Sequence, residues 1–190
     1  FKLAYIYIKM SNHADAAKCF EKVVELDKTN GDAWGSLGHC YLALNQLSEA
    51  HNSYLNAISN IENKMNPTLW YGIGILYEKS KYYKFAEDAF LTVLKTEEHP
   101  NKIDEISFRL GIIYMQEPTT PERLNKAVNC FTSVLKNPPS PFTKADVLAQ
   151  LGLAHELLAD GEAKTYYTRA IEADPKHSWA HQRLGWYIFT

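Results

Sequence analysis

The stretch from residue 37 to residue 57 reads Leu37-Gly-His-Cys-Tyr41, then eight further residues, then Ala50-His-Asn-Ser-Tyr54-Leu-Asn-Ala57. In both halves the apolar side chains are spaced three and four residues apart, which places each set on one face of an α-helix. The sequence therefore predicts two amphipathic helices that follow one another directly along the chain.

The first half of this pattern recurs along the chain at spacings of 36, 37, 41 and 33 residues. Its copies are Ile73-Gly74, Leu110-Gly111, Leu151-Gly152 and Leu184-Gly185. The second half recurs as an Ala followed four residues later by an aromatic residue, at Ala16 and Phe20, Ala86 and Phe90, Ala127 and Phe131, and Ala163 and Tyr167. A single helix pair cannot bury its own apolar face, so the pairs are expected to stack on one another.

Prolines mark the boundaries between repeats, because proline ends one helix and starts the next. We divide the chain into a partial repeat at 1–30, four repeats at 31–66, 67–103, 104–144 and 145–177, and a truncated repeat at 178–190. The segment Glu117-Pro-Thr-Thr-Pro-Glu122 is expected to form a longer loop inside the fourth of these units. Since the first and last units are incomplete, we expect the chain to be a fragment of a longer array.

The glycines of the repeat are expected to mark close helix crossings. Glycine within a helix costs about 1 kcal/mol of helix propensity, so its recurrence needs a compensating reason. Each such glycine is followed by an alanine in the next helix, which suggests that the two helices approach too closely for larger side chains. The large rings are then expected to fill the space between neighbouring repeats: Tyr41, Tyr54, Tyr77, Phe90 and Phe131.

The composition argues against contact with nucleic acid or membrane. The 20 basic residues are scattered among 22 acidic residues, and the formal net charge is -2, so no basic surface for DNA or RNA is predicted. No apolar run approaches the roughly 18 residues that a membrane helix needs. The three cysteines, Cys19, Cys40 and Cys130, are odd in number and far apart, which favours reduced thiols over disulfides.

Several short strings imitate active-site motifs, but each lacks a second requirement. Gly72-Ile-Gly74 has no third glycine and no preceding strand, so packing explains it better than dinucleotide binding. His155-Glu156 begins a zinc-protease motif, but the second histidine would fall at Ala159. Cys40 is interpreted as a small buried residue. We therefore predict no catalytic residue, no cofactor and no metal site, and hence a protein that is not an enzyme.

Over the whole chain the repeat resembles the tetratricopeptide pattern, whose period is about 34 residues. The resemblance implies an all-α fold, a right-handed superhelix (α-solenoid) of five to six helix-turn-helix repeats, in which the first helix of each repeat lines a groove. An amphipathic helix of a partner protein is expected to bind there. The alternative, that some of these side chains only pack against neighbouring helices, stays open at each position. The groove positions are Tyr5, Gly35, His39, Tyr71, Ile75, Phe108, Ile112, Met115 and Leu153, and we expect Tyr71, Ile75, Phe108 and Ile112 to form the centre.

Co-chaperone tetratricopeptide domains hold a C-terminal carboxylate with Lys, Asn and Arg at set groove positions. In the two alignments of the repeats that best match those positions, this chain carries other residues. They are Phe1, Tyr5, Ser36, Thr68 and Gly72 in one alignment, and Gly35, His39, Gly72, Glu105 and Arg109 in the other. Binding of chaperone tails is therefore disfavoured.

Longer strings between residues 31 and 177 resemble the fungal general transcriptional co-repressor of tetratricopeptide type. They are Trp34-Gly-Ser-Leu-Gly-His-Cys-Tyr-Leu42, Leu69-Trp-Tyr-Gly-Ile-Gly-Ile-Leu-Tyr77, Ala86-Glu-Asp-Ala-Phe90 and Glu105-Ile-Ser-Phe-Arg-Leu-Gly-Ile-Ile-Tyr114. This resemblance implies a nuclear adaptor that contacts no DNA itself. Such an adaptor bridges sequence-specific repressors to a WD40 co-repressor through the N-terminal helix of that partner. The second candidate is the tetratricopeptide region of UTX-type histone demethylases, which shares the Tyr-Gly-x-Gly and Arg-Leu-Gly strings.

Overall fold

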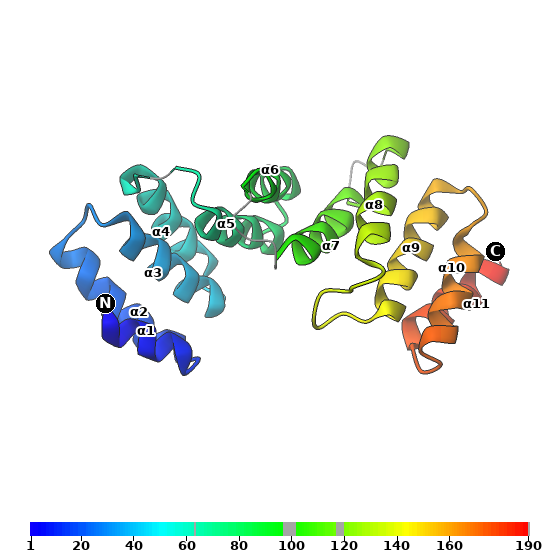
Figure 1. Ribbon diagram of the computed structural model, residues 1–190, viewed down its shortest axis with the longest axis horizontal. Helices are drawn as coiled ribbons and strands as arrows, with labels where there is room; N and C mark the ends of the chain where they lie inside the picture. The colour runs from blue at the N-terminus through cyan, green and yellow to red at the C-terminus, as the bar shows by residue number, and fades with distance from the viewer. Residues whose placement is uncertain (63, 97–101, 117–119, 190) are drawn as a thin grey trace. The chain divides into compact units, whose positions relative to one another are not determined.

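The structure of the protein, a computed structural model, describes residues 1–62, 64–96, 102–116 and 120–189 (Figure 1). Eleven α-helices and no strand are found in these ranges, which confirms the all-α prediction. The helices are α1 (Lys2–Lys9), α2 (His13–Leu26), α3 (Gly31–Ala43), α4 (Leu47–Asn60), α5 (Pro67–Lys79), α6 (Tyr83–Leu94), α7 (Ile103–Tyr114), α8 (Pro121–Val134), α9 (Lys144–Leu158), α10 (Ala163–Ala173) and α11 (Ser178–Phe189).

The chain forms two compact units, Phe1–Glu98 and His99–Thr190. In the first unit, helices α1 to α6 pack in chain order, and α3 also contacts α5. In the second unit, helices α7 to α11 pack in chain order. Within each unit, consecutive helices therefore contact one another, which is the packing expected of stacked helix pairs.

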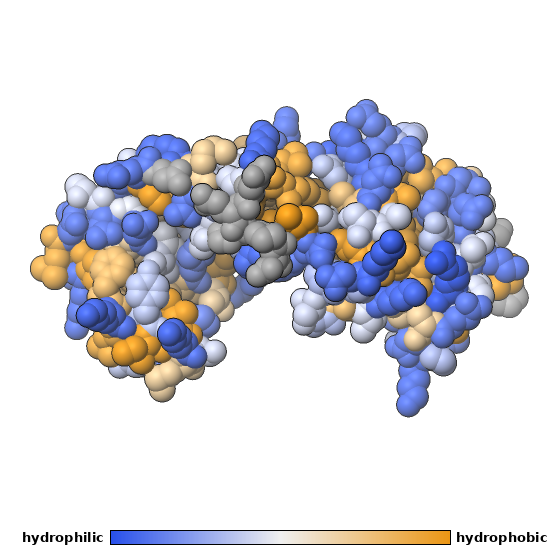
Figure 2. Space-filling view, in the orientation of Figure 1, coloured by the Kyte–Doolittle hydropathy of each residue, from blue (hydrophilic) through white to orange (hydrophobic). Residues whose placement is uncertain are grey.

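Each unit buries a core of small and aromatic side chains. The alanines of the second helices, Ala16, Ala50, Ala86, Ala127 and Ala163, are fully buried. The aromatic side chains that follow them, Phe20, Tyr54, Phe90, Phe131 and Tyr167, are also inaccessible. At the start of the first unit, α1 leaves Leu3, Ile6 and Met10 exposed, and hydrophobic surface is visible over this part of the unit in Figure 2.

The glycines of the repeat are packed under aromatic rings of the same helix pair. A Cβ atom added to Gly38 would lie 2.7 Å from the Tyr54 ring, and one added to Gly74 would lie 2.6 Å from the Phe90 ring. Gly111 meets Phe131 and Gly152 meets Tyr167 in the same way. The close approach is therefore real, but the group that needs the space is the ring four residues after the alanine, and not the alanine that the sequence suggested.

Short polar caps fix where several helices begin. A side chain at the helix start accepts a hydrogen bond from a backbone N–H of the first turn, which satisfies a donor that has no partner within the helix. These caps are Asn12 of α2, Asn30 of α3, Asn66 of α5, Thr120 of α8 and Thr143 of α9. Pro67 and Pro121 lie in the first turns of α5 and α8, where proline needs no partner for its nitrogen.

The predicted loop at Glu117 to Glu122 lies partly outside the described residues, since residues 117–119 are not described and α8 begins at Pro121. In four other repeats a left-handed residue, Ser11, Asn45, Lys81 or Ala159, follows the first helix. Among the described helices, none is both long and apolar enough to cross a lipid bilayer.

Candidate functional site

A groove of about 550 Å³ opens on the first helices of the first unit. We call it the first-helix groove. It lies between α1, α3 and the start of α5, and most of the residues that line it are apolar or uncharged. Its walls include Tyr5 and Ile8 of α1, Gly35 and His39 of α3, and Thr68 and Leu69 of α5. Two of the predicted contact residues, Tyr5 and His39, are therefore brought together here.

Tyr5 presents a ring to the groove from α1. The side chain is 47% exposed, and its ring packs edge-on against Phe20 at a centroid distance of 5.7 Å. The Tyr5 ring is thus held against the core on one side, and the rest of the ring is accessible to solvent. A half-exposed, well-oriented tyrosine is a typical anchor in protein interfaces, because little side-chain freedom is lost on binding.

His39 is held in place by Tyr54, which belongs to the second helix of the same repeat. The Tyr54 hydroxyl lies 2.8 Å from His39 Nδ1, and the two rings meet edge-on at 5.4 Å. Burial raises the pKa of the Tyr54 hydroxyl, so the group stays protonated. We assign this hydroxyl as the donor to Nδ1, which places the proton of a neutral His39 ring on Nε2.

Gly35 is a buried residue of α3 that lines the groove. A Cβ atom at this position would meet only the Leu69 side chain, at 3.5 Å, and the Ala57 side chain, at 3.9 Å. These are ordinary contact distances, so Gly35 is not required for helix packing in the way that Gly38 and Gly74 are.

Tyr71 and Ile75 lie on α5 of the same unit but outside the lining of the first-helix groove. Both are partly buried. The Tyr71 ring is 6.2 Å from that of Phe90, and Ile75 packs against the core cluster that contains Ile73. That a partner contacts them stays a prediction.

In the second unit, an aromatic ring covers one of the expected contact residues. Phe108 is 3% exposed because Phe142 stacks on it at 4.1 Å and Phe131 meets it edge-on at 5.5 Å. Phe142 is 38% exposed and directly precedes the cap of α9. The ring that this region presents to solvent is therefore that of Phe142, which the helical pattern did not single out.

The remaining predicted residues of the second unit differ in burial. Met115 is 8% exposed, while Ile112 and Leu153 are partly buried. The contact of Ile112 and Leu153 with a partner stays a prediction, as does that of Phe108 and Met115.

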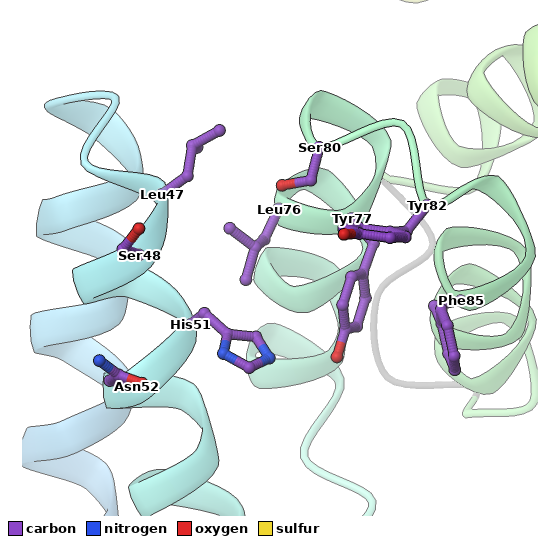
Figure 3. A pocket seen from close by; sticks show the side chains of 9 residues that line it. All are labelled: Leu47, Ser48, His51, Asn52, Leu76, Tyr77, Ser80, Tyr82 and Phe85. Atoms are coloured by element: carbon purple, nitrogen blue, oxygen red, sulfur yellow. The ribbon is translucent and has the colours of Figure 1, made fainter.

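Sequence reasoning missed a second pocket of about 490 Å³ in the first unit, between α4, α5 and α6 (Figure 3). We call it the α4–α6 pocket. Leu47 and His51 of α4 face Tyr77 of α5 and Phe85 of α6 across it (Figure 3). The rings of Tyr77 and Phe85 are 5.4 Å apart. The available signal was the aromatic run Tyr82-Tyr-Lys-Phe85 at the start of a second helix, whereas the predicted contacts all lie on first helices or at their ends.

The polar residues singled out for possible chemistry have structural partners. Glu156 accepts hydrogen bonds from the Tyr167 hydroxyl at 2.6 Å and from Arg183 at 2.7 Å, and so joins α9, α10 and α11. His155 Nδ1 lies 2.7 Å from Asp160. Burial raises the pKa of Cys40 and that of Cys130 to about 11, so both thiols stay protonated at neutral pH. Within the described residues, His, Cys, Asp and Glu form no group of three or more that could hold a metal ion.

The tetratricopeptide repeat family matches the chain at residues 7–60 and at residues 145–177. The general transcriptional corepressor trfA of Dictyostelium discoideum is 39% identical over 105 residues, which cover 55% of this chain and 8% of that protein. The general transcriptional corepressor ssn6 of Schizosaccharomyces pombe is 36% identical over 91 residues, 48% of this chain and 8% of that protein. The chain thus spans less than a tenth of the length of these relatives.

Among solved structures, YrrB, described as a tetratricopeptide protein with an unusual peptide-binding site, superposes with a TM-score of 0.78. The match covers 96% of this chain and 88% of YrrB at 21% sequence identity, so it shows the fold alone. The chain accordingly contains tetratricopeptide repeats at residues 7–60 and 145–177, and over about half of its length it is similar to general transcriptional corepressors.

Proposed function

We propose that the chain is a non-catalytic protein-binding scaffold within a nuclear transcriptional corepressor. In this role it bridges sequence-specific, DNA-bound repressors to a WD40-type corepressor and does not itself contact DNA. The observation that supports the proposal most directly is the 39% identity to a general transcriptional corepressor over 105 residues. The same similarity favours this function over that of a UTX-type histone demethylase region.

The first-helix groove is the proposed binding site for the N-terminal helical segment of the WD40 partner. Its apolar walls at Ile8 and Leu69 suit the apolar stripe of an amphipathic helix. Tyr5 supplies a pre-oriented anchor. Tyr71 and Ile75 of the first unit are proposed as further contacts of a protein partner. Phe108, Ile112, Met115 and Leu153 are proposed as contacts on the second unit.

Calorimetric titration with a peptide spanning the N-terminal helix of a WD40-type corepressor tests the proposal. The variant Tyr5→Asp and the variant Thr68→Arg each place a charge in the groove at an exposed position. Each should bind at least about tenfold more weakly than the unmodified chain, because the apolar contact is replaced by a charge that stays hydrated.

The matched control is Ile6→Asp, which introduces the same charge one residue away at a side chain that is 54% exposed and not part of the groove lining. Circular dichroism should be helical for all three variants. Unchanged affinity of both groove variants, or equal weakening by Ile6→Asp, would exclude the first-helix groove as the binding site.

A further inference from the structure

A third cavity of the first unit has apolar and aromatic walls. It encloses about 320 Å³ and lies between α2, α3 and α4. Val24 and Leu37 contribute apolar surface, and Trp34 and Tyr41 contribute aromatic rings. The indole Nε1–H of Trp34 donates to the Lys28 carbonyl oxygen at 2.9 Å, which fixes the orientation of this ring. The cavity is thus suited to a flat or extended side chain. We call it the acidic-aromatic pocket, because three carboxylates also line it.

Three carboxylates surround these apolar walls: Glu21 and Glu25 of α2, and Glu49 of α4. No lysine or arginine is among the residues that line the cavity. Lys18, one helical turn before Glu21, is instead bonded to Asp15 at 3.0 Å. The pocket therefore combines apolar surface with three carboxylates and no lining cation, which is complementary to a cation.

The three carboxylates differ in their hydrogen-bond and ion-pair partners. Glu21 accepts a hydrogen bond from the Tyr41 hydroxyl at 2.6 Å. Glu25 and Glu49 are exposed, and neither has an ion pair among the described residues. Burial raises the pKa of the Tyr41 hydroxyl, and the nearby charges of Glu21 and Glu49 raise it further. Two carboxylates from different helices thus act on the same ring.

The next repeat offers an internal comparison, because its aromatic residues are the same and the positions of the three glutamates carry no carboxylate. The acidic residue at an equivalent lining position is Asp88, in place of Asn52. Trp70 and Tyr77 occupy the repeat positions of Trp34 and Tyr41, and the Trp70 indole likewise donates to a backbone carbonyl, that of Lys64, at 2.7 Å. The positions of Glu21, Glu25 and Glu49 are occupied by Leu55, Ser59 and Phe85. Phe85 lies against Tyr77 in the apolar α4–α6 pocket (Figure 3). The negative charge is therefore not a requirement of helix packing.

We propose that the acidic-aromatic pocket binds an arginine side chain of a partner protein. A guanidinium group is planar, stacks on aromatic rings and donates two parallel hydrogen bonds to a carboxylate. The pocket offers Trp34 and Tyr41 for the first interaction and Glu25 and Glu49 for the second. The ammonium group of lysine lacks the planar face and the paired donors, and is more strongly hydrated. This site is separate from the first-helix groove, so it does not depend on the function proposed for that groove.

The test is a titration of the ¹⁵N-labelled chain with the peptide acetyl-Gly-Arg-Gly-Arg-Gly-amide, followed through the indole N–H signals of Trp34 and Trp70. The variants Trp34→Phe and Trp70→Phe assign the two signals. The Trp34 signal should shift in a saturable manner while the Trp70 signal stays in place. The peptide with citrulline instead of arginine, which keeps the shape but not the charge, should give no shift.

The double variant Glu25→Gln/Glu49→Gln should bind the arginine peptide roughly tenfold more weakly, since two charge-assisted contacts are lost. The control variant Glu62→Gln/Glu172→Gln carries the same change in charge at exposed positions outside the pocket and should bind normally. The dispersion of the amide spectrum shows whether each variant is folded. Equal shifts of both indole signals, an equal response to the citrulline or lysine peptide, or the same shift with magnesium chloride alone would overturn the proposal.

Discussion

Single residues decide how closely the two helices of a repeat approach. At Gly74 the bare backbone supports the fully buried ring of Phe90, and the same contact recurs at Gly38, Gly111 and Gly152. The gain in packing offsets the weak helix propensity of glycine, because an aromatic ring buries a large apolar area. The recurrence of glycine in mid-helix therefore has a steric cause.

The variant Gly74→Ala is expected to destabilise the chain by about 1 to 3 kcal/mol, because the added methyl group overlaps the Phe90 ring and the core has no space to accept it. The control is Gly185→Ala in α11, where an added Cβ atom meets nothing within 4 Å. That variant should be neutral or slightly stabilising, since alanine favours the helix. Urea denaturation measures both, and equal stability of the two variants would contradict the steric explanation.

At the scale of one element, the start of α9 is fixed by reciprocal hydrogen bonds and by a contact with α11. The Thr143 hydroxyl accepts from the backbone N–H of Asp146, and the Asp146 carboxylate accepts from the backbone N–H of Thr143 at 2.7 Å. The backbone N–H of Ala180 donates to His177 Nδ1, so His177 Nε2–H is the donor to Asp146 at 3.1 Å. One carboxylate thus joins the ends of two helices.

Asp146 should make the stability of the chain depend on pH. Burial by itself would raise the pKa of its carboxyl group, but the hydrogen bonds from Thr143 and His177 outweigh burial and hold the pKa below its ordinary value of 3.8. A lowered pKa in the folded state stabilises the fold fully above the unfolded value, and this stabilisation is lost as the pH falls through the folded value. Asp146→Asn should therefore cost about 1 kcal/mol at neutral pH.

Denaturation curves recorded between about pH 3 and pH 7 check this expectation. The difference between Asp146→Asn and the unmodified chain should be constant at the upper end and should shrink below about pH 4. The exposed Asp88→Asn on α6 is the control and should have little effect. A difference that is independent of pH would show that the charge of Asp146 does not contribute.

At the scale of the molecule, stability is distributed over neighbouring helix pairs. The first unit holds three pairs, α1 with α2, α3 with α4 and α5 with α6. Repeat proteins need about three repeats before stacking buries a sufficient core. The first unit therefore meets this condition by itself.

A fragment of residues 1–96 is expected to give a helical circular dichroism spectrum and to unfold cooperatively in urea. A fragment of residues 1–60, which keeps only two pairs, should lose most of this stability, because the apolar face of α4 is left uncovered. A disordered 1–96 fragment would show that the first unit needs the rest of the chain.

The sequence was sufficient for the helix pairs, because apolar spacing and the repeated Gly and Ala positions are local signals. The sequence did not predict that Phe142 covers Phe108, because Phe142 lies in a segment without helical periodicity. The acidic-aromatic pocket was missed for another reason. Its carboxylates come from two helices, and an exposed Glu in a helix has the same appearance in sequence whether it faces solvent or a cavity.

The comparison of the acidic-aromatic pocket with the next repeat has a consequence for how such a protein diversifies. Leu55, Ser59 and Phe85 are exposed, and they stand in place of the three glutamates around a shared Trp and Tyr. On the arginine-binding proposal, specificity therefore differs between repeats through exposed positions, while the shared Trp and Tyr are kept. Duplication of such a repeat would provide further copies of the same helix pair, and their exposed residues could then change binding specificity without any change of fold.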